Sequence, residues 1–441
     1  MRFAALALAV LAATASGQAP AAPPAQQPKP AAPAPAAAVP VPLGEAATQV
    51  LVRAHDEAGH WALRAIVLLS LGRDFHPAGS AALVKALKDK DARMQAYAVE
   101  VLRRMDAAAA PEVATRELVD ALVDGPLQEK NDFVRDRTLE ALLLLVPGSG
   151  AKDRNEWREW WRKNELLHVP PAWTPPPAAP RAAGGTVAGS VVEKAFDLRD
   201  AGLQVAIVID STGSMQQAIN AARDAIDDVV ALLSGIAPRF EVGLVHYKDF
   251  GDMGDGAKLL EPLTKDQKVV RERLAKLVAG GGGDTPERVE CGVGIALGKE
   301  MGWDRDANRL VLVIGDAPAH EEVLTGLVEM VKRAHDQPFS RAKGPVTGAK
   351  VPSKLRPFIT SCIATNPAAK PHFEAIAAAG GGACVLLPMA APNGKDVASA
   401  QSKAVQEVVR HVLKLSFGTQ YEAQLNLFAD VYFTWRDAKA F

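Results

Sequence analysis

The sequence is poor in cysteine and in aromatic residues. Only three of its 441 residues are cysteine, and Phe, Trp and Tyr together make up 5%. Three thiols allow one intramolecular bridge at most, which excludes a small disulfide-stapled scaffold. Cys291, Cys362 and Cys384 all lie in apolar stretches. Buried free thiols are therefore the preferred interpretation, with a bridge between Cys362 and Cys384 as the alternative.

The chain also lacks an excess of charge of either sign. It contains 50 Lys and Arg residues and 51 Asp and Glu residues, which gives a formal net charge of −1. Without an overall basic field, nucleic acid is not expected as a partner. The content of 48% hydrophobic and 23% charged residues is that of a soluble globular protein. The length is that of two or three domains of about 150 residues each.

No segment has an apolar run long enough to predict a membrane span. The first residues read Met1, Arg2 and an apolar run over 3–13, followed by small residues up to Gly17. This run is shorter than the roughly 20 residues that a membrane helix needs. Its charge and length are typical of a secretion signal, with an Ala-rich helix as the alternative. We therefore expect a signal peptide at 1–17 and, because no cysteine follows for a lipid anchor, a soluble protein that is secreted or periplasmic.

Proline is concentrated in two alanine-rich segments. Nine of the 31 prolines lie at 20–42 and six lie at 170–180. Because proline fixes φ and lacks an N–H donor, such segments form extended spacers rather than helices or strands. They predict linkers at 18–43 and 169–198. The remaining segments are a middle domain, a C-terminal domain and a C-terminal extension, at 44–168, 199–419 and 420–441.

Apolar residues of the middle domain recur at helical spacing. The clearest stripes are Trp61, Ala65, Ile66 and Leu69; Met94, Ala98, Val101 and Leu102; and Val134, Thr138, Ala141, Leu142 and Leu145. Their spacing resembles that of HEAT-type helical repeats, which implies an α-solenoid that offers a binding surface. Trp157, Trp160 and Trp161 lie close together on a later helix. They are interpreted as a cap on the last repeat, with an aromatic binding platform as the alternative.

Continuous apolar runs of the C-terminal domain end in polar residues. These runs lie at 203–209, 310–314, 358–364 and 383–387, and helical stripes lie at 215–233, 288–299, 323–334 and 405–415. A strand without alternation is buried on both faces, as in a parallel sheet covered by helices. We therefore expect an α/β fold with a doubly wound, mostly parallel sheet. The extension at 420–441 alternates enough to predict one or two further strands.

Oxygen donors follow several of these strands. The candidate metal ligands are Asp210, Thr212, Ser214, Thr285 and Asp316. Because the carboxyl ends of parallel strands meet at one edge of a sheet, these donors can converge. Carboxylates and hydroxyls without sulfur or imidazole favour Mg²⁺, with Mn²⁺ or Ca²⁺ as alternatives. Taken alone, the Asp-x-Thr-x-Ser pattern is more often a helix N-cap than a metal site. The metal site is predicted because oxygen donors occur in three separate loops, which contain Asp210, Thr285 and Asp316.

These motifs resemble the von Willebrand factor type A domain with its metal-ion-dependent adhesion site. The family's Asp-x-Ser/Thr-x-Ser pattern is matched by Asp210, Thr212 and Ser214, its threonine by Thr285 and its late aspartate by Asp316. The resemblance implies that the hydroxyls touch the metal, while the aspartates act mostly through bound water. It also implies that one coordination position stays open for an acidic group of a partner. This chain departs from the pattern in that alanine and proline follow its late aspartate.

Three further residues are candidates for supporting the metal site. Asp284, beside Thr285, adds a charge that can enter the coordination shell. Tyr247 and Asp249 follow the apolar run at 242–245. We expect them to stabilise the loops through hydrogen bonds, and the alternative is that they line the metal site directly. No lysine follows the glycine-rich loop at 280–283 in the manner of a nucleotide P-loop. No Ser-His-Asp order fits either, so we expect no catalytic residue and no enzyme.

A basic segment at 337–356 contains five positive residues and no acidic one. It joins a helix to the following strand and therefore lies at the edge of the sheet opposite the metal. A solvated loop is the preferred interpretation, with a clasp for an anionic partner as the alternative.

The sequence thus predicts a secreted binding protein whose metal coordinates an exposed Glu or Asp of a protein partner. One alternative is a metal-assisted hydrolase that uses the same cation to activate water. Another is a scaffold that acts through the helical repeats and keeps a vestigial metal site. The oligomeric state stays open.

Overall fold

The structure is a computed structural model that describes residues 44–73, 75–174, 190–249, 251, 254–282, 285–336, 356–387 and 397–438. The predicted signal peptide, the first linker, Asp284 and the basic segment up to residue 355 lie outside these ranges. None of the helices within them is both long and apolar enough to cross a membrane.

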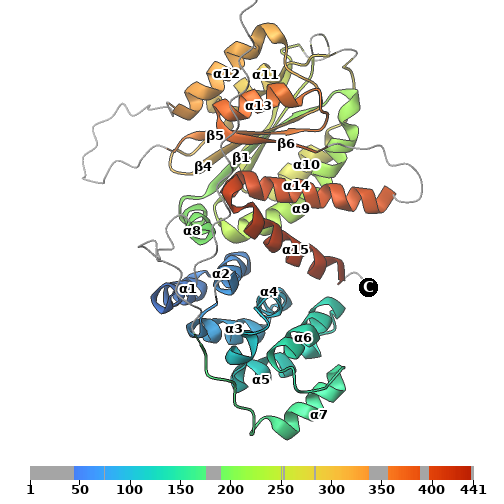
Figure 1. Ribbon diagram of the computed structural model, residues 1–441. Helices are drawn as coiled ribbons and strands as arrows, with labels where there is room; N and C mark the ends of the chain where they lie inside the picture. Colours follow the sequence, from blue (N-terminus) through green and yellow to red (C-terminus); the bar gives the residue numbers. More distant parts are fainter. Residues whose placement is uncertain are drawn as a thin grey trace, which may run out of the picture. The chain divides into compact units, whose positions relative to one another are not determined.

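A six-stranded sheet forms the centre of the C-terminal region (Figure 1). Its strands are β1 (Leu203–Asp210), β2 (Phe240–Tyr247), β3 (Ala257–Thr264), β4 (Asn308–Gly315), β5 (Phe358–Ala364) and β6 (Gly381–Leu386). Their order is β3-β2-β1-β4-β5-β6, and all neighbours are parallel except β2 and β3. The predicted doubly wound, mostly parallel sheet is confirmed. The order reverses between β1 and β4, where such sheets bind their ligands.

Helices cover both faces of the sheet because the central strands are apolar on both faces. Successive residues of a strand point to opposite faces: Val205 and Ile209 of β1 belong to one core cluster, and Ala206 and Val208 belong to the other. The first cluster includes α9 (Gln216–Ile236) and α14 (Val397–Phe417), and the second includes α11 (Val289–Ala296), α12 (Glu321–Asp336) and α13 (Lys370–Ala379). Figure 1 shows the two helical layers on either side of the strands.

A separate all-helical region precedes the sheet. Its helices are α1 (Glu45–Glu57), α2 (Trp61–Arg73), α3 (Ser80–Leu87), α4 (Ala92–Arg103), α5 (Arg116–Asp124), α6 (Asp132–Leu145) and α7 (Arg154–Asn164). Asp91 caps α4 by accepting a hydrogen bond from the backbone N–H of Arg93 at 3.0 Å, as expected for a residue of that type before a helix. The predicted helical character is confirmed, and the likeness to HEAT repeats stays a prediction.

The tryptophan cluster packs into this helical region. The rings of Trp157 and Trp161 on α7 are buried. Trp161 Nε1 donates a hydrogen bond to Asp120 Oδ1 on α5 at 2.6 Å, and the ring of Trp160 lies 5.6 Å from that of Trp157. Burial of two of the three rings supports the capping interpretation over an exposed aromatic platform.

Residues 191–198, which the proline pattern assigns to the second linker, begin a further helix, α8 (Val191–Ala201). Val191, Val192, Ala195 and Leu198 are buried. Ser190 caps the start of the helix, because its hydroxyl accepts a hydrogen bond from the backbone N–H of Glu193 at 3.2 Å. Its buried face makes it part of the packed core rather than a spacer.

The prediction of strands at 420–441 is wrong. Residues Glu422–Ala438 form α15, because Leu425, Phe428, Ala429 and Tyr432 repeat at helical spacing and are buried. Phe428 O accepts a hydrogen bond from Tyr97 Oη on α4 at 2.7 Å, and Tyr432 Oη donates to Asp228 Oδ1 on α9 at 2.9 Å. The helix therefore contacts both the helical region and the sheet region.

All three cysteines are free thiols in the structure. Cys362 on β5 is buried and lies opposite Cys384 on β6 in the strand register. Burial raises the pKa of the Cys362 thiol well above its usual range and that of Cys384 to about 11. These two thiols are therefore protonated near neutral pH, which makes them weak nucleophiles.

Candidate functional site

The turn after β1 holds a buried carboxylate with one unsatisfied oxygen. Asp210 is the last residue of β1 and has no exposed surface. Its Oδ1 accepts hydrogen bonds from Thr212 N at 2.8 Å and Thr212 Oγ1 at 2.7 Å, a local turn that aspartate favours. Its Oδ2 is buried and has no hydrogen-bond partner among the described residues. Burial raises the pKa of Asp210 to about 7, and the nearby charge of Asp316 adds to this effect.

The glycine-rich loop lies directly against this turn. Gly280 N donates to Ser211 O at 3.1 Å, and Gly213 N donates to Gly281 O at 3.0 Å. Gly282 has a φ of +74°, and a Cβ at this position would lie 2.6 Å from the Cβ of Thr212. Only glycine allows the loop to approach Thr212 this closely.

The third loop joins the other two at the same edge. Asp316 follows β4 and is partly exposed. Glu287 N donates to Pro318 O at 2.9 Å, which ties the end of the glycine-rich loop to the loop after β4. The structure thus brings the three predicted loops together at the carboxyl edge of β1 and β4.

The remaining candidate ligands face outward. Ser214 lies in a short 3₁₀ turn, Gly213–Met215, and its side chain is exposed, as is that of Thr285. Their hydroxyls are therefore accessible from solvent. Neither makes a side-chain hydrogen bond to another described residue of this edge, so their part in a ligand set stays a prediction, as does that of Asp284, which lies outside the described residues.

Glu287 is a site residue that the sequence reasoning missed. It is only 2% exposed, and its Oε1 lies 3.3 Å from the point that a Cβ of Gly282 would occupy, next to Thr212. The only signal in the sequence is its position two residues after Thr285, just before an apolar helix. With Asp210 and Asp316, it places a third carboxylate at this edge.

The two supporting residues predicted from the sequence occupy different environments. Asp249 is 7% exposed, and its Oδ1 forms a hydrogen bond with His320 Nε2 at 3.0 Å, which joins the loop after β2 to the loop after β4. This contact supports the bracing interpretation. Tyr247 lies opposite Asp210 in the strand register and is fully buried. Burial, together with the charges of Asp210, Glu287 and Asp316, raises the pKa of Tyr247 well above its usual range.

The residues at this edge fit a divalent cation. Burying a carboxylate oxygen without a partner is unfavourable, and a cation beside Asp210 Oδ2 would compensate it. Thr212 gives its hydroxyl proton to Asp210, so its oxygen keeps lone pairs that can face an ion. Among the described residues, no group of three or more His, Cys, Asp or Glu side chains is arranged to hold a metal. The expected ligands are mostly hydroxyls, the donors that Mg²⁺ accepts together with water.

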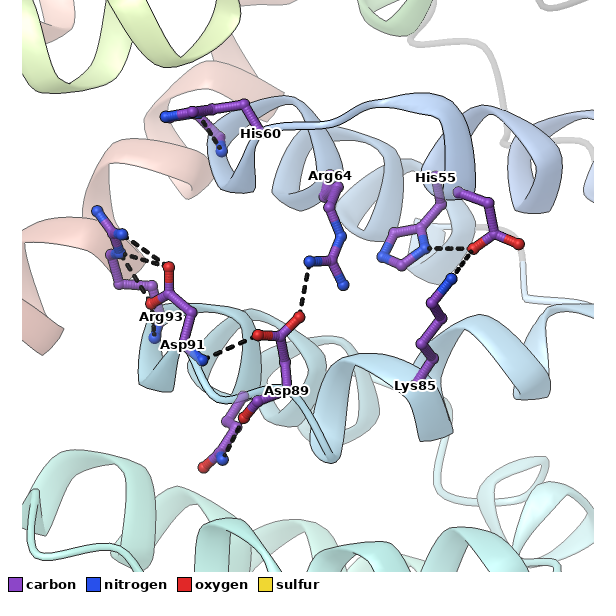
Figure 2. Close-up of polar contacts among 10 residues, drawn as sticks. His55, His60, Arg64, Lys85, Asp89, Asp91 and Arg93 are labelled. Atoms are coloured by element: carbon purple, nitrogen blue, oxygen red, sulfur yellow. Dashed lines mark hydrogen bonds and ion pairs between the residues drawn. The ribbon is translucent and has the colours of Figure 1, made fainter.

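The helical region contains a polar cluster of another kind (Figure 2). Lys85 Nζ donates to Asp56 Oδ1 at 2.8 Å, His55 Nδ1 lies 3.4 Å from the same oxygen, and Arg64 pairs with Asp89 at 2.6 Å. These contacts connect neighbouring helices.

The comparisons with known proteins concern the sheet region. Residues 204–387 match the family model described as the von Willebrand factor A domain. The alpha-protein kinase vwkA of Dictyostelium discoideum is 30% identical over 118 residues, which are 26% of this chain and 18% of that protein. The crystal structure of the conserved hypothetical protein BatB from Bacteroides thetaiotaomicron covers 48% of this chain and all of that chain, with 16% identity and a TM-score of 0.32. The family-model match supports a von Willebrand factor A domain at residues 204–387, and the metal-ion-dependent adhesion site stays a prediction. The chain spans less than a fifth of the curated relative.

Proposed function

We propose that this protein is a secreted or periplasmic binding protein. Its von Willebrand factor A domain, a type of domain that commonly mediates protein–protein interaction, holds Mg²⁺ at the carboxyl edge of the sheet. The metal site receives an exposed Glu or Asp of a protein partner, and the helical region offers a second interaction surface. The proposal assigns no catalytic residue.

The observation that carries the proposal is the buried Oδ2 of Asp210. It lies where the strand order reverses, and no described residue donates a hydrogen bond to it. A lone buried carboxylate oxygen costs stability unless a proton or a cation compensates its charge. Glu287 and Asp316 add negative charge nearby, as their effect on the pKa of Tyr247 indicates. This electrostatic environment favours a cation over a phosphate or another anion.

The neutral hydroxyls explain why such a site would bind an acidic partner. Thr212, Ser214 and Thr285 would hold the ion without cancelling its charge, and Asp210 and Asp316 would bind it directly or through water. When bound, the ion would keep part of its positive charge and one open coordination position. A carboxylate of another protein can coordinate it there. The exposure of Ser214 and Thr285 leaves this position open to a partner.

Calorimetry with Mg²⁺, Mn²⁺ and Ca²⁺ tests the metal site directly. We expect uptake of one divalent ion by the full chain and at least tenfold weaker binding by Thr285→Ala. Thr434→Ala is a matched control, because Thr434 lies on α15 and its hydroxyl donates to the backbone oxygen of Asp430 in the same helix. Failure of the folded wild-type protein to take up any of the three ions would overturn the proposal.

Partner binding needs a second experiment. We expect proteins captured from the native extracellular fraction to be released by EDTA and not to be captured by Thr285→Ala. Capture that survives both changes would support a scaffold that acts through the helical region. Turnover of phosphate or ester substrates that is lost in Asp210→Ala would support the hydrolase instead.

A further inference from the structure

A polar cavity lies at the amino edge of the sheet, opposite the candidate metal site. It has a volume of about 260 Å³ and is lined by Lys194, Asn308, Arg309, Arg356 and Ser416 together with apolar side chains. Asn308 and Arg309 begin β4, and Arg356 precedes β5. The eight residues of β1 separate the two edges by roughly 25 Å at about 3.3 Å per residue. The cavity is therefore independent of the metal site.

Arg309 brings a buried and poorly compensated positive charge to this cavity. The residue is only 5% exposed, and its Nε has no hydrogen-bond partner among the described residues. The guanidinium lies 4.0 Å over the ring of Phe358, and one of its terminal nitrogens donates to the backbone oxygen of Arg356. Burial lowers the pKa of Arg309, which indicates that its surroundings do not compensate its charge fully.

Two further cations share one carboxylate. Arg356 donates to both oxygens of Asp197, at 2.6 and 2.8 Å, and Lys194 Nζ lies 3.4 Å from Asp197 Oδ2. Lys194 Nζ and Arg356 also donate to Asn308 Oδ1, at 3.0 and 2.9 Å. Burial lowers the pKa of Lys194 despite the attraction of Asp197.

The acidic groups around the cavity do not balance its three cations. In the described part of the chain, Asp197 is the carboxylate that bonds to Lys194 and Arg356. Asp304 also attracts Arg309, but it is exposed, and the neighbouring Arg305 opposes its effect. Lys194 and Arg356 remain partly exposed, with 28% and 32% of their side chains accessible. An anion can therefore reach their free N–H groups from solvent.

We propose that this cavity binds a phosphate group. The excess of positive charge matches a polyvalent oxyanion better than a single carboxylate, and the N–H donors of Lys194 and Arg356 are the groups that recognise phosphate oxygens. Asn308 and Asp197 hold these two side chains in place, and Arg309 adds charge from beneath. The phosphate is either a free ion or a monoester group on a small molecule.

Binding of inorganic phosphate and of glycerol phosphate to the full chain tests the proposal. Titration calorimetry in EDTA, at constant ionic strength set with chloride, excludes binding through a metal. We expect saturable binding of at least one of the two ligands, and the stronger one identifies the source of the phosphate. No binding of either ligand by the folded protein would overturn the proposal.

Substitutions locate the site. Lys194→Met keeps the apolar stem and should weaken binding at least tenfold, whereas Lys276→Met, an exposed residue at the end of α10 (Gln267–Lys276), should leave it unchanged. Asp197→Asn should tighten binding several-fold, because it removes the competing carboxylate. Circular dichroism checks that each variant is folded. Equal phosphate affinity in the wild type, Lys194→Met and Asp197→Asn would overturn the proposal. Thr285→Ala should bind phosphate with the affinity of the wild type, even if its affinity for metal is reduced.

Discussion

Thr212 donates two hydrogen bonds to the same oxygen of Asp210, from its backbone nitrogen at 2.8 Å and from its hydroxyl at 2.7 Å. The other oxygen of this carboxylate is buried without a partner in the described part of the chain. The local turn thus satisfies one oxygen of Asp210 and leaves the other without compensation.

Asp210→Asn should stabilise the metal-free protein and abolish its response to Mg²⁺. Because burial raises the pKa of Asp210 to about 7, the folded state binds more protons than the unfolded state between about pH 4 and pH 7. The wild-type protein therefore loses stability as the pH rises through this window. The Asp210→Asn variant has no charge to bury and does not lose this stability. We expect its free energy of unfolding in EDTA at pH 8 to be roughly 1–3 kcal/mol higher than that of the wild type.

Urea denaturation with EDTA and with Mg²⁺ measures both effects. Asp255→Asn is a suitable control, because Asp255 is exposed on the turn before β3. A variant as responsive to Mg²⁺ as the wild type would contradict the assignment of Asp210 to the site.

Glu287→Gln should weaken divalent-ion binding without unfolding the protein. The side chain is buried next to Thr212, and its charge acts on Tyr247 together with those of Asp210 and Asp316. Loss of one nearby negative charge should reduce Mg²⁺ affinity about tenfold, which corresponds to about 1.4 kcal/mol. Calorimetry on Glu287→Gln and on Glu300→Gln, an exposed residue after α11, makes the comparison. Equal affinities would assign Glu287 a purely structural part.

The sheet could be predicted from the sequence because its central strands are unusually apolar. Strands β1 and β4 have almost no polar interruption, and so continuous an apolar run is typical of a strand that is buried on both faces. Strand β3 was not anticipated, because it is an edge strand that contains Pro262 and is only partly buried. Its antiparallel pairing with β2 also depends on contacts that periodicity does not reveal.

The candidate site was only partly predictable for a similar reason. Asp210 and Thr212 share one turn, so their spacing alone indicates that they act together. Glu287 reaches the site through folding, because a backbone hydrogen bond to Pro318 joins two loops that are distant from Asp210 in the sequence. The extension was predicted wrongly because Tyr421, Leu425, Leu427 and Val431 suggest alternation, whereas the buried set that includes Phe428 and Ala429 follows the helical period.

Tyr97→Phe should test how much α15 contributes to stability. The Tyr97 hydroxyl is buried and donates to Phe428 O, and the substitution leaves that carbonyl with one partner fewer. We expect the free energy of unfolding to fall by about 1–2 kcal/mol. Tyr421→Phe, at a partly exposed position, should change it by less than about 0.5 kcal/mol. Urea denaturation of both variants decides the matter, and equal effects would mean that the hydrogen bond to α15 contributes nothing.

His55 should make the helical region sensitive to acid. Its side chain is buried, and burial, aided by the charges of Arg64 and Lys85, lowers the pKa of its imidazole, while Asp56 opposes the shift (Figure 2). The folded protein therefore keeps His55 neutral at pH values where the unfolded chain, with a pKa near 6.5, already binds a proton. Because the unfolded state binds more protons, stability falls as the pH drops below about 6.5, by at most about 1.4 kcal/mol per pH unit for this group. Urea denaturation at pH 7.5 and 5.5 should show a smaller loss in His55→Gln than in wild type, and Lys276→Gln, at the exposed end of α10, should match the wild type. An unchanged pH dependence in His55→Gln would mean that other groups cause the loss.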